Sequence, residues 1–184
     1  MPSLSSPPAA TTAHAFVPET RFGLWFLSTA TWRVHVLQRA LNDLQRLAQM
    51  TPPVPGELLL IGRRHVRSNN SWMHNFHRLV KGKPRHQLLM HPQDLQRRQL
   101  QDGQRVRIRS RTGSLEVEVQ ACEDMMPGVV SLPHGWGHAR PGVQMGIATA
   151  QPGASANDLT DERQLDELSG NAALNGVPVT VAAA

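Results

Sequence analysis

The sequence predicts a mainly β domain of the α+β class, in which short helices accompany the strands. Two observations predict the strands: a continuous apolar run at Leu58–Ile61, and two alternating segments at Arg105–Arg111 and Leu115–Val119. A third observation is the frequency of Gly- and Pro-containing turn signals between these segments. Together they favour a compact β domain with brief helical connections.

The first third of the chain differs from the rest in composition. Residues 1–20 are rich in Ser, Pro, Ala and Thr without periodicity, which predicts disorder. Apolar residues recur at helical spacing from Val34 to Met50, which predicts one amphipathic helix whose apolar face needs a partner. The Pro-rich stretch that follows predicts a stiff linker. These features divide the chain into a disordered segment at residues 1–20, a helical extension with a linker at 21–56, and a globular domain at 57–184.

The globular domain opens with a predicted buried strand at Leu58–Gly62. The second of its predicted helices has Pro92 at the first helical position and Asp94 in the first turn, both of which favour a helix start. The remaining expected elements are a short helix at Met73–Val80, a strand at Gln87–His91, a helix from Pro92 to about Leu100, a strand at Pro127–Pro133, a long loop at Pro141–Asp158, a short helical stretch at Leu159–Leu168 and a last strand at Gly176–Val181.

The two alternating segments predict a β-hairpin with a two-residue loop at Thr112-Gly113. That loop length pairs Arg109 with Glu116 and Arg107 with Glu118, so one face is apolar and the other is a ladder of opposite charges. Exposed pairs of this kind contribute only about 0.2–1 kcal/mol each. Because glutamates neutralise these arginines, the hairpin is expected to be a solvated surface rather than a nucleic-acid interface.

Composition excludes several functional classes. The single Cys122 rules out an internal disulfide and every multi-cysteine zinc or iron–sulfur pattern, and it fits a cytoplasmic location. The most apolar N-terminal stretch, Phe22–Trp32, is too short to span a bilayer. We therefore expect a cytoplasmic protein without a membrane span.

Positive charge is concentrated in the middle of the sequence. The net charge is +5, but residues 57–111 carry 13 Lys/Arg against 3 Asp/Glu, whereas residues 112–184 carry 2 against 9. Much of this charge lies in the loop Ile61–Asn75, which follows the first predicted strand. Arg, Ser and Asn are donors suited to phosphate oxygens, so the loop could hold an anionic ligand. A solvated basic loop is the alternative, and composition alone leaves both open.

Five separated motifs add a family resemblance. In order they are GRR-x-x-RSNNSWMHN, MHP-x-D, DG-x-x-V, PGVVSLPHGWGH, and a C-terminal pair made of N-D-LTD and SGNAALNGVPV. Over about Glu57–Val181 the chain resembles the C-terminal domain of molybdopterin oxidoreductases, the formate dehydrogenase and dimethyl sulfoxide reductase group. The resemblance implies a double-psi β-barrel that binds molybdopterin guanine dinucleotide, in the bis form and with molybdenum or tungsten held mainly by absent domains.

The resemblance also implies a cofactor site built from loops at one end of the barrel. The first loop would contact the pyrophosphate and pterin, the HGWGH loop would lie against the cofactor, and two asparagines would match pterin or guanine edges. The implied cofactor-binding residues are Gly62, Arg63, Arg67, Ser68, Asn69, His74, His134, Gly135, Trp136, Asn157 and Asn175. His134 and His138 could be a zinc pair, but no further ligand accompanies them, so we predict no metal ligand and no catalytic residue.

Three functions of different class fit this sequence. The first is the cofactor-binding domain of a formate dehydrogenase-like oxidoreductase, present as a fragment or separate subunit, whose partner is the catalytic domains or subunit. The second is a non-catalytic cofactor carrier or assembly factor. The third, which the hairpin disfavours, is a basic nucleic-acid-binding module. One cysteine and no cluster motif are too little for a complete oxidoreductase of this group.

Overall fold

The computed structural model describes residues 41–50, 54–165 and 170–184. The chain divides into two compact units, Met1–Thr51 and Pro52–Ala184. In the first unit residues 41–49 are helical, as the periodicity predicts. The expected disordered segment 1–20 and the N-terminal part of the expected helix lie outside the described residues.

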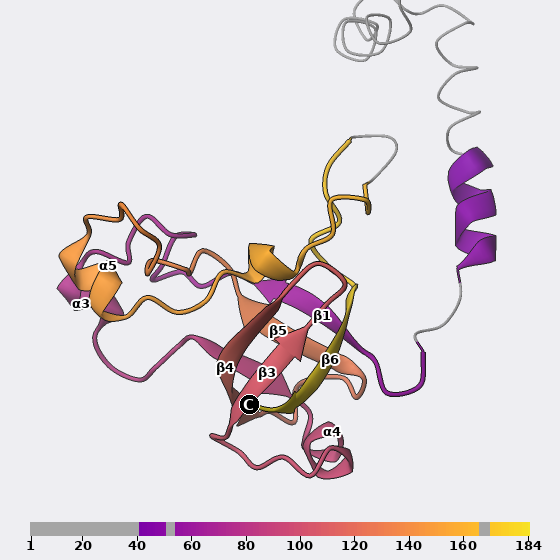
Figure 1. Ribbon diagram of the computed structural model, residues 1–184, viewed down its shortest axis with the longest axis horizontal. Coiled ribbons are helices and arrows are strands. Elements are labelled where there is room, and N and C mark those ends of the chain that lie inside the picture. Colours follow the sequence, from indigo (N-terminus) through magenta and orange to yellow (C-terminus); the bar gives the residue numbers. More distant parts are fainter. Residues whose placement is uncertain (1–40, 51–53, 166–169) are drawn as a thin grey trace, which may run out of the picture. The chain divides into compact units, whose positions relative to one another are not determined.

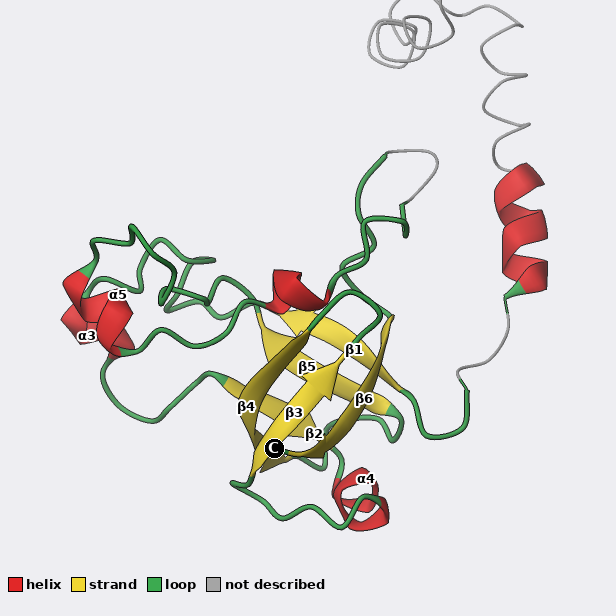
Figure 2. Cartoon of the chain, viewed as in Figure 1, coloured by secondary structure: helices red, strands yellow, loops and turns green. Residues whose placement is uncertain are grey.

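In its described residues the second unit contains six strands, and each lies at a segment that the sequence predicts as a strand (Figures 1 and 2). They are β1 (Leu58–Arg63), β2 (Gln87–Met90), β3 (Arg105–Arg109), β4 (Ser114–Ala121), β5 (Val129–Pro133) and β6 (Val177–Ala183).

The short helices differ more from expectation. They are α3 (His77–Val80), α4 (Pro92–Arg97), α5 (Gly146–Ala150) and the 3-10 helix η1 (Ala156–Leu159). The helix expected from Met73 begins only at His77, because the preceding loop is a series of turns. The expected long loop Pro141–Asp158 instead contains α5 and the start of η1, whose small residues carry no helical periodicity. No helix in the described ranges is long and apolar enough to cross a membrane.

The strands close into a barrel in the order β1-β5-β2-β4-β3-β6. The pairs β1·β5 and β2·β4 are parallel, and the four other pairs are antiparallel. This architecture confirms the mainly β class and the closed barrel that the family resemblance implies. Alternate residues point inward, because successive side chains of a strand lie on opposite faces. The resulting core is almost entirely aliphatic, and its most buried members include Leu58, Leu88, Met90, Val106, Ile108, Val119, Val130 and Leu132.

The hairpin β3–β4 has a different register from the one expected. Arg107 lies opposite Glu116 and Arg109 lies opposite Ser114, so the predicted pairs are wrong by two residues. The cause is a longer loop, in which Ser110 N–H donates to the Gly113 carbonyl oxygen at 2.9 Å. A shift of two residues keeps every side chain on its expected face. The arginine–glutamate face therefore exists, with Arg107 Nη2 lying 2.6 Å from Glu116 Oε1.

Candidate functional site

Three of the sequence motifs meet at one end of the barrel. Because β1 and β5 are parallel and adjacent, their carboxyl ends lie at the same edge, and His134 N–H donates to the Arg63 carbonyl oxygen at 3.0 Å. The start of β6 pairs with β1 in the opposite direction and brings Asn175 to this edge. There Gly62 N–H donates to Asn175 Oδ1 at 2.8 Å. The predicted residues Gly62, His134 and Asn175 are thus brought together.

The tip of the β3–β4 hairpin contacts the N-D-LTD motif, residues 157–161. Arg111 forms a two-pronged ion pair with Asp161, and Thr112 Oγ1 donates to the Thr160 carbonyl oxygen at 3.0 Å. A Cβ at Gly113 would lie 2.4 Å from the Asp158 carbonyl oxygen, so only glycine allows this close approach. Asn157, one residue before Asp158, is exposed on η1. Its side chain has no hydrogen-bond partner among the described residues, which leaves the amide available for a ligand.

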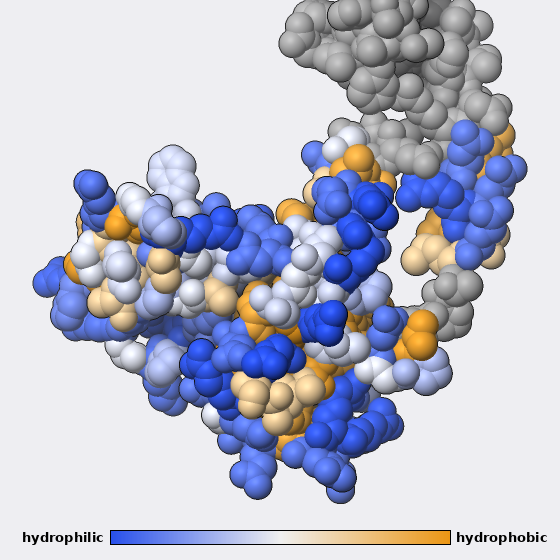
Figure 3. All heavy atoms as spheres, viewed as in Figure 1, coloured by the Kyte–Doolittle hydropathy of each residue, from blue (hydrophilic) through white to orange (hydrophobic). Residues whose placement is uncertain are grey.

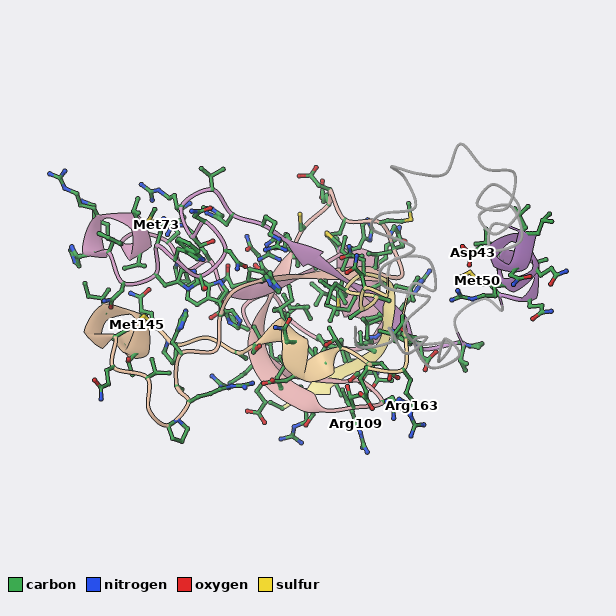
Figure 4. All side chains as sticks on the ribbon, turned by 90° about the horizontal axis from the view of Figure 1, so that it is seen from above. Asp43, Met50, Met73, Arg109, Met145 and Arg163 are labelled. Atoms are coloured by element: carbon green, nitrogen blue, oxygen red, sulfur yellow. The ribbon has the colours of Figure 1, made fainter. Side chains whose placement is uncertain are left out.

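The loops after β1 and β5 interlock. Gly135 has a φ of 90°, and a Cβ there would lie 2.3 Å from the Asn70 carbonyl oxygen. The backbone of one loop therefore rests directly on the backbone of the other. Asn75 adds a second link, because its Oδ1 accepts from Ile147 N at 3.0 Å and from Ala148 N at 3.2 Å, at the start of α5. Both views accordingly show α3 and α5 next to each other (Figures 1 and 4).

Aromatic rings fill the space between these loops. Trp136 lies between His74 and His86, with ring centroids 4.2 Å and 5.2 Å away. His74 Nδ1 lies 2.6 Å from His138 Nε2, and both imidazoles are buried. His86 Nε2 contacts the backbone of Ala154, which ties the segment before β2 to the same cluster. Loops from three parts of the chain thus form one lobe beside the barrel end.

The histidines of this lobe are held neutral. Burial, together with smaller contributions from the neighbouring His138 and His86, lowers the pKa of His74 to about 4. Burial also lowers the pKa values of His86 and His138. For His134 the pKa is lowered first by burial and then by Arg64. Near neutral pH the imidazoles therefore add little positive charge to the lobe, whose visible surface mixes hydrophilic and apolar residues (Figure 3).

The predicted residues of the first loop fall into two groups. Arg63 donates to the carbonyl oxygens of Ser131 and Gln87 at 2.6 and 2.7 Å, so its guanidinium joins β1, β5 and β2. Burial lowers its pKa to about 10. The buried Ser68 likewise uses its hydroxyl inside the loop, on the His65 carbonyl oxygen at 2.9 Å. Phosphate binding by these two side chains stays a prediction that their internal contacts disfavour.

The second group is turned outward. Arg67 is exposed, and its guanidinium has no ion pair within the described residues. Asn69 is exposed with a φ of 40°, and Asn70 with a φ of 65° accepts from Arg64 Nη1 at 2.8 Å. Left-handed backbone at two successive asparagines turns the loop sharply and presents Arg64 and Arg67 at its surface.

Sequence reasoning missed four residues of the lobe. Asn75, His86, His138 and Gly153 act through contacts with distant segments. His138 lies four residues after His134, a spacing that suggests only a metal ligand. In the described part of the chain, no group of three or more His, Cys, Asp or Glu side chains is placed to hold a metal ion.

Comparison with known proteins identifies the family. The family described as the molybdopterin dinucleotide binding domain matches residues 58–178. The chain belongs to this family. The match to the molybdopterin dinucleotide binding domain begins with β1 and ends within β6, so it covers the first five strands, the start of β6 and both interlocked loops.

Two relatives place this molybdopterin dinucleotide binding domain in context. Over 121 residues the chain is 31% identical to a subunit of the tetrathionate reductase of Salmonella typhimurium, a match that spans 56% of this chain and 12% of that protein. Acetylene hydratase from Pelobacter acetylenicus shares the fold, with a TM-score of 0.58 and 21% identity over 69% of this chain and 18% of that one. The chain therefore spans less than a fifth of either relative.

The residues present fit the phosphate and base groups of a dinucleotide. Arg64 and Arg67 supply exposed guanidinium groups for phosphate oxygens. Asn157 offers a free amide, and Asn175 uses its carbonyl oxygen on Gly62, which leaves its NH2 group to donate. Cationic forks and amides at one barrel end are the donor set that such a ligand needs.

Proposed function

We propose that this chain is the cofactor-binding part of a larger molybdopterin oxidoreductase, present as a fragment or a separate subunit. The observation that carries the proposal is the interlocked pair of loops at one barrel end, where Arg64 and Arg67 are exposed on the first loop and the amides of Asn157 and Asn175 are exposed at the same end. Family membership and the small share of each relative support it. The partner in this proposal is the catalytic domains or subunit, and the location is the cytoplasm.

The chain's own residues bind and orient the ligand in this proposal. Arg67 binds the pyrophosphate from the first loop, while the Asn157 amide pairs with the edge of the guanine base. Gly135 and Trp136 fix the second loop against the first, so both loops close on one ligand. When bound, a molybdopterin guanine dinucleotide would supply the redox metal, molybdenum or tungsten.

The proposal does not name a substrate. The motifs resemble formate dehydrogenase-like proteins, whereas the two relatives described above are an acetylene hydratase and a subunit of a tetrathionate reductase. Neither supports formate. Most of each relative has no counterpart in this chain, so a substrate pocket in those parts would not be represented here.

Titration with guanosine 5′-diphosphate, a soluble fragment of the dinucleotide, tests the proposal. We expect saturable binding by calorimetry, weaker binding of adenosine 5′-diphosphate and still weaker binding of inorganic pyrophosphate. Replacing Arg67 by Gln should weaken GDP binding about tenfold to a hundredfold, because one charge-assisted hydrogen bond contributes about 1.5–3 kcal/mol.

Arg97→Gln is the matched control. Arg97 is exposed on α4, which follows β2 at the opposite end of the barrel from the interlocked loops. The control should bind GDP as the original chain does. Equal losses in both variants would show general electrostatic attraction to the basic surface, and the proposed site would be wrong.

A further inference from the structure

A pair of buried histidines joins the two interlocked loops. His74 belongs to the loop after β1 and His138 to the loop after β5, and their side chains are nine-tenths or more buried. His74 Nδ1 lies 2.6 Å from His138 Nε2, and the rings are nearly perpendicular, at 86°. One ring must donate and the other must accept. The contact therefore requires that at least one of these two nitrogens carries a lone pair.

Burial and nearby basic groups oppose a charge on this pair, whereas the Gly135 backbone partly favours the protonated form of His138. The cavity beside His74 is lined by the basic or titratable groups His65, Arg67 and Arg85, and His86 reaches the cluster through Trp136. His134 and Arg64 face the same lobe from the second and first loops. In the described part of the chain, no carboxylate lines this cavity.

The second ring nitrogen of His74, Nε2, makes protonation of His74 still less favourable. His74 Nε2 is buried and has no hydrogen-bond partner within the described residues. Protonation of His74 would place an N–H group there without an acceptor, and leaving a buried donor unsatisfied is unfavourable. Protonation of both rings would also turn two N–H groups toward each other across 2.6 Å.

We propose that His74 and His138 form a clasp that closes the two cofactor loops at neutral pH and opens them when both imidazoles are protonated. Opening separates the loop after β5 from the loop after β1 and exposes Trp136. That the clasp controls retention of a dinucleotide rests on the function proposed above. The clasp itself is a property of the free chain.

The direction of the pH effect follows from the lowered pKa of His74. In the open state the imidazole takes up a proton below its ordinary value of 6.5, whereas in the closed state it does so only at about 4. The contribution of neutral His74 to closure is therefore fully present above pH 6.5 and is lost as the pH falls toward 4. Over this range the closing equilibrium constant should fall on the order of a hundredfold for His74 alone.

Nuclear magnetic resonance of the free chain tests the clasp. We expect the ring nitrogens of His74 and His138 to titrate together, well below 6.5, with uptake of about two protons. The indole signal of Trp136 should change over the same pH range. Independent titration of the two rings at ordinary values, with an unchanged Trp136 signal, would overturn the proposal.

Two variants sharpen the test. His138→Gln keeps a hydrogen-bonding side chain but cannot become charged, so opening should take up about one proton and occur at lower pH. His77→Gln removes an exposed histidine of α3 and should leave the transition unchanged. If His138→Gln kept the original two-proton transition, the clasp would be assigned to the wrong pair. Failure of GDP to bind at pH 7.5 would contradict the proposed function and leave these results intact.

Discussion

At Gly135 the backbones of the two loops are in direct contact. The φ of 90° at this glycine and the 2.3 Å between a Cβ and the Asn70 carbonyl oxygen allow no other side chain without movement of a backbone. Gly135→Ala should therefore lower the free energy of unfolding by roughly 3–5 kcal/mol, measured by urea denaturation.

Gly128 provides the matched control for this substitution. Its φ of 86° is similar, but no atom lies within 4 Å of a Cβ there. Gly128→Ala should cost only about 1–2 kcal/mol, the strain of left-handed backbone alone. If both variants lost the same stability, the loops would not be in contact at Gly135.

For single residues, the sequence predicts the chemical character of a side chain better than its contacts with distant segments of the chain. Gly62 and Asn175 were predicted for one site, and the structure joins them by a hydrogen bond. The internal role of Arg63 could not be predicted, because its carbonyl partners belong to strands far along the chain. His86 was missed for the same reason, since its partner Ala154 lies 68 residues away.

Among the short elements, α5 depends on a residue outside itself. Met145 at its start makes no side-chain cap, and Asn75 from the first loop accepts the two exposed N–H groups instead. Asn75→Ala should lower the free energy of unfolding by about 0.5–2 kcal/mol, the usual loss when a helix cap is removed.

Replacement of Asn75 by Asp should keep the cap and serves as the control for Asn75→Ala. A carboxylate accepts the same N–H groups and adds a favourable negative charge at a helix N-terminus, so stability should be retained. Hydrogen exchange at Ile147 and Ala148 reports the cap directly. Unchanged exchange in Asn75→Ala would show that α5 forms without it.

At the scale of elements, strands were predicted from alternation and apolar runs, while the partners of the strands were not. Burial on alternate positions of β3 and β4 follows directly from the sequence pattern. Their register depended on the loop length, and Ser110 lengthened the loop by bonding to Gly113. Barrel closure needs parallel pairing of strands distant in sequence, so only the family resemblance suggested it.

For the molecule as a whole, the ion pair at the hairpin tip makes stability depend on acid pH. The Asp161 carboxylate accepts from Arg111 and from the Arg163 backbone, which lowers its pKa to about 2. A carboxyl group with a lowered folded-state pKa contributes stability that is present above 3.8 and lost as the pH falls toward 2. Urea midpoints should therefore decline between pH 4 and pH 2.

Two substitutions distinguish the contribution of the Asp161 carboxylate to acid sensitivity from that of the other acidic groups. Asp161→Asn should flatten the decline between pH 4 and pH 2, because the amide cannot titrate. Asp124→Asn, at an exposed position without an ion pair among the described residues, should leave the decline as it is. A decline of unchanged steepness in Asp161→Asn would assign the acid sensitivity to other groups.

The closed barrel also bears on how the chain behaves apart from any partner. Each of the six strands has a neighbour on both sides, so the barrel presents no open strand edge to another copy. Trp72 and Phe76, 77% and 58% exposed on the loop before α3, are the exposed aromatic side chains in the described part of the chain, and they are one apolar surface at which self-association can start. Polar replacements at these two side chains should accordingly reduce aggregation of the purified chain without changing the barrel.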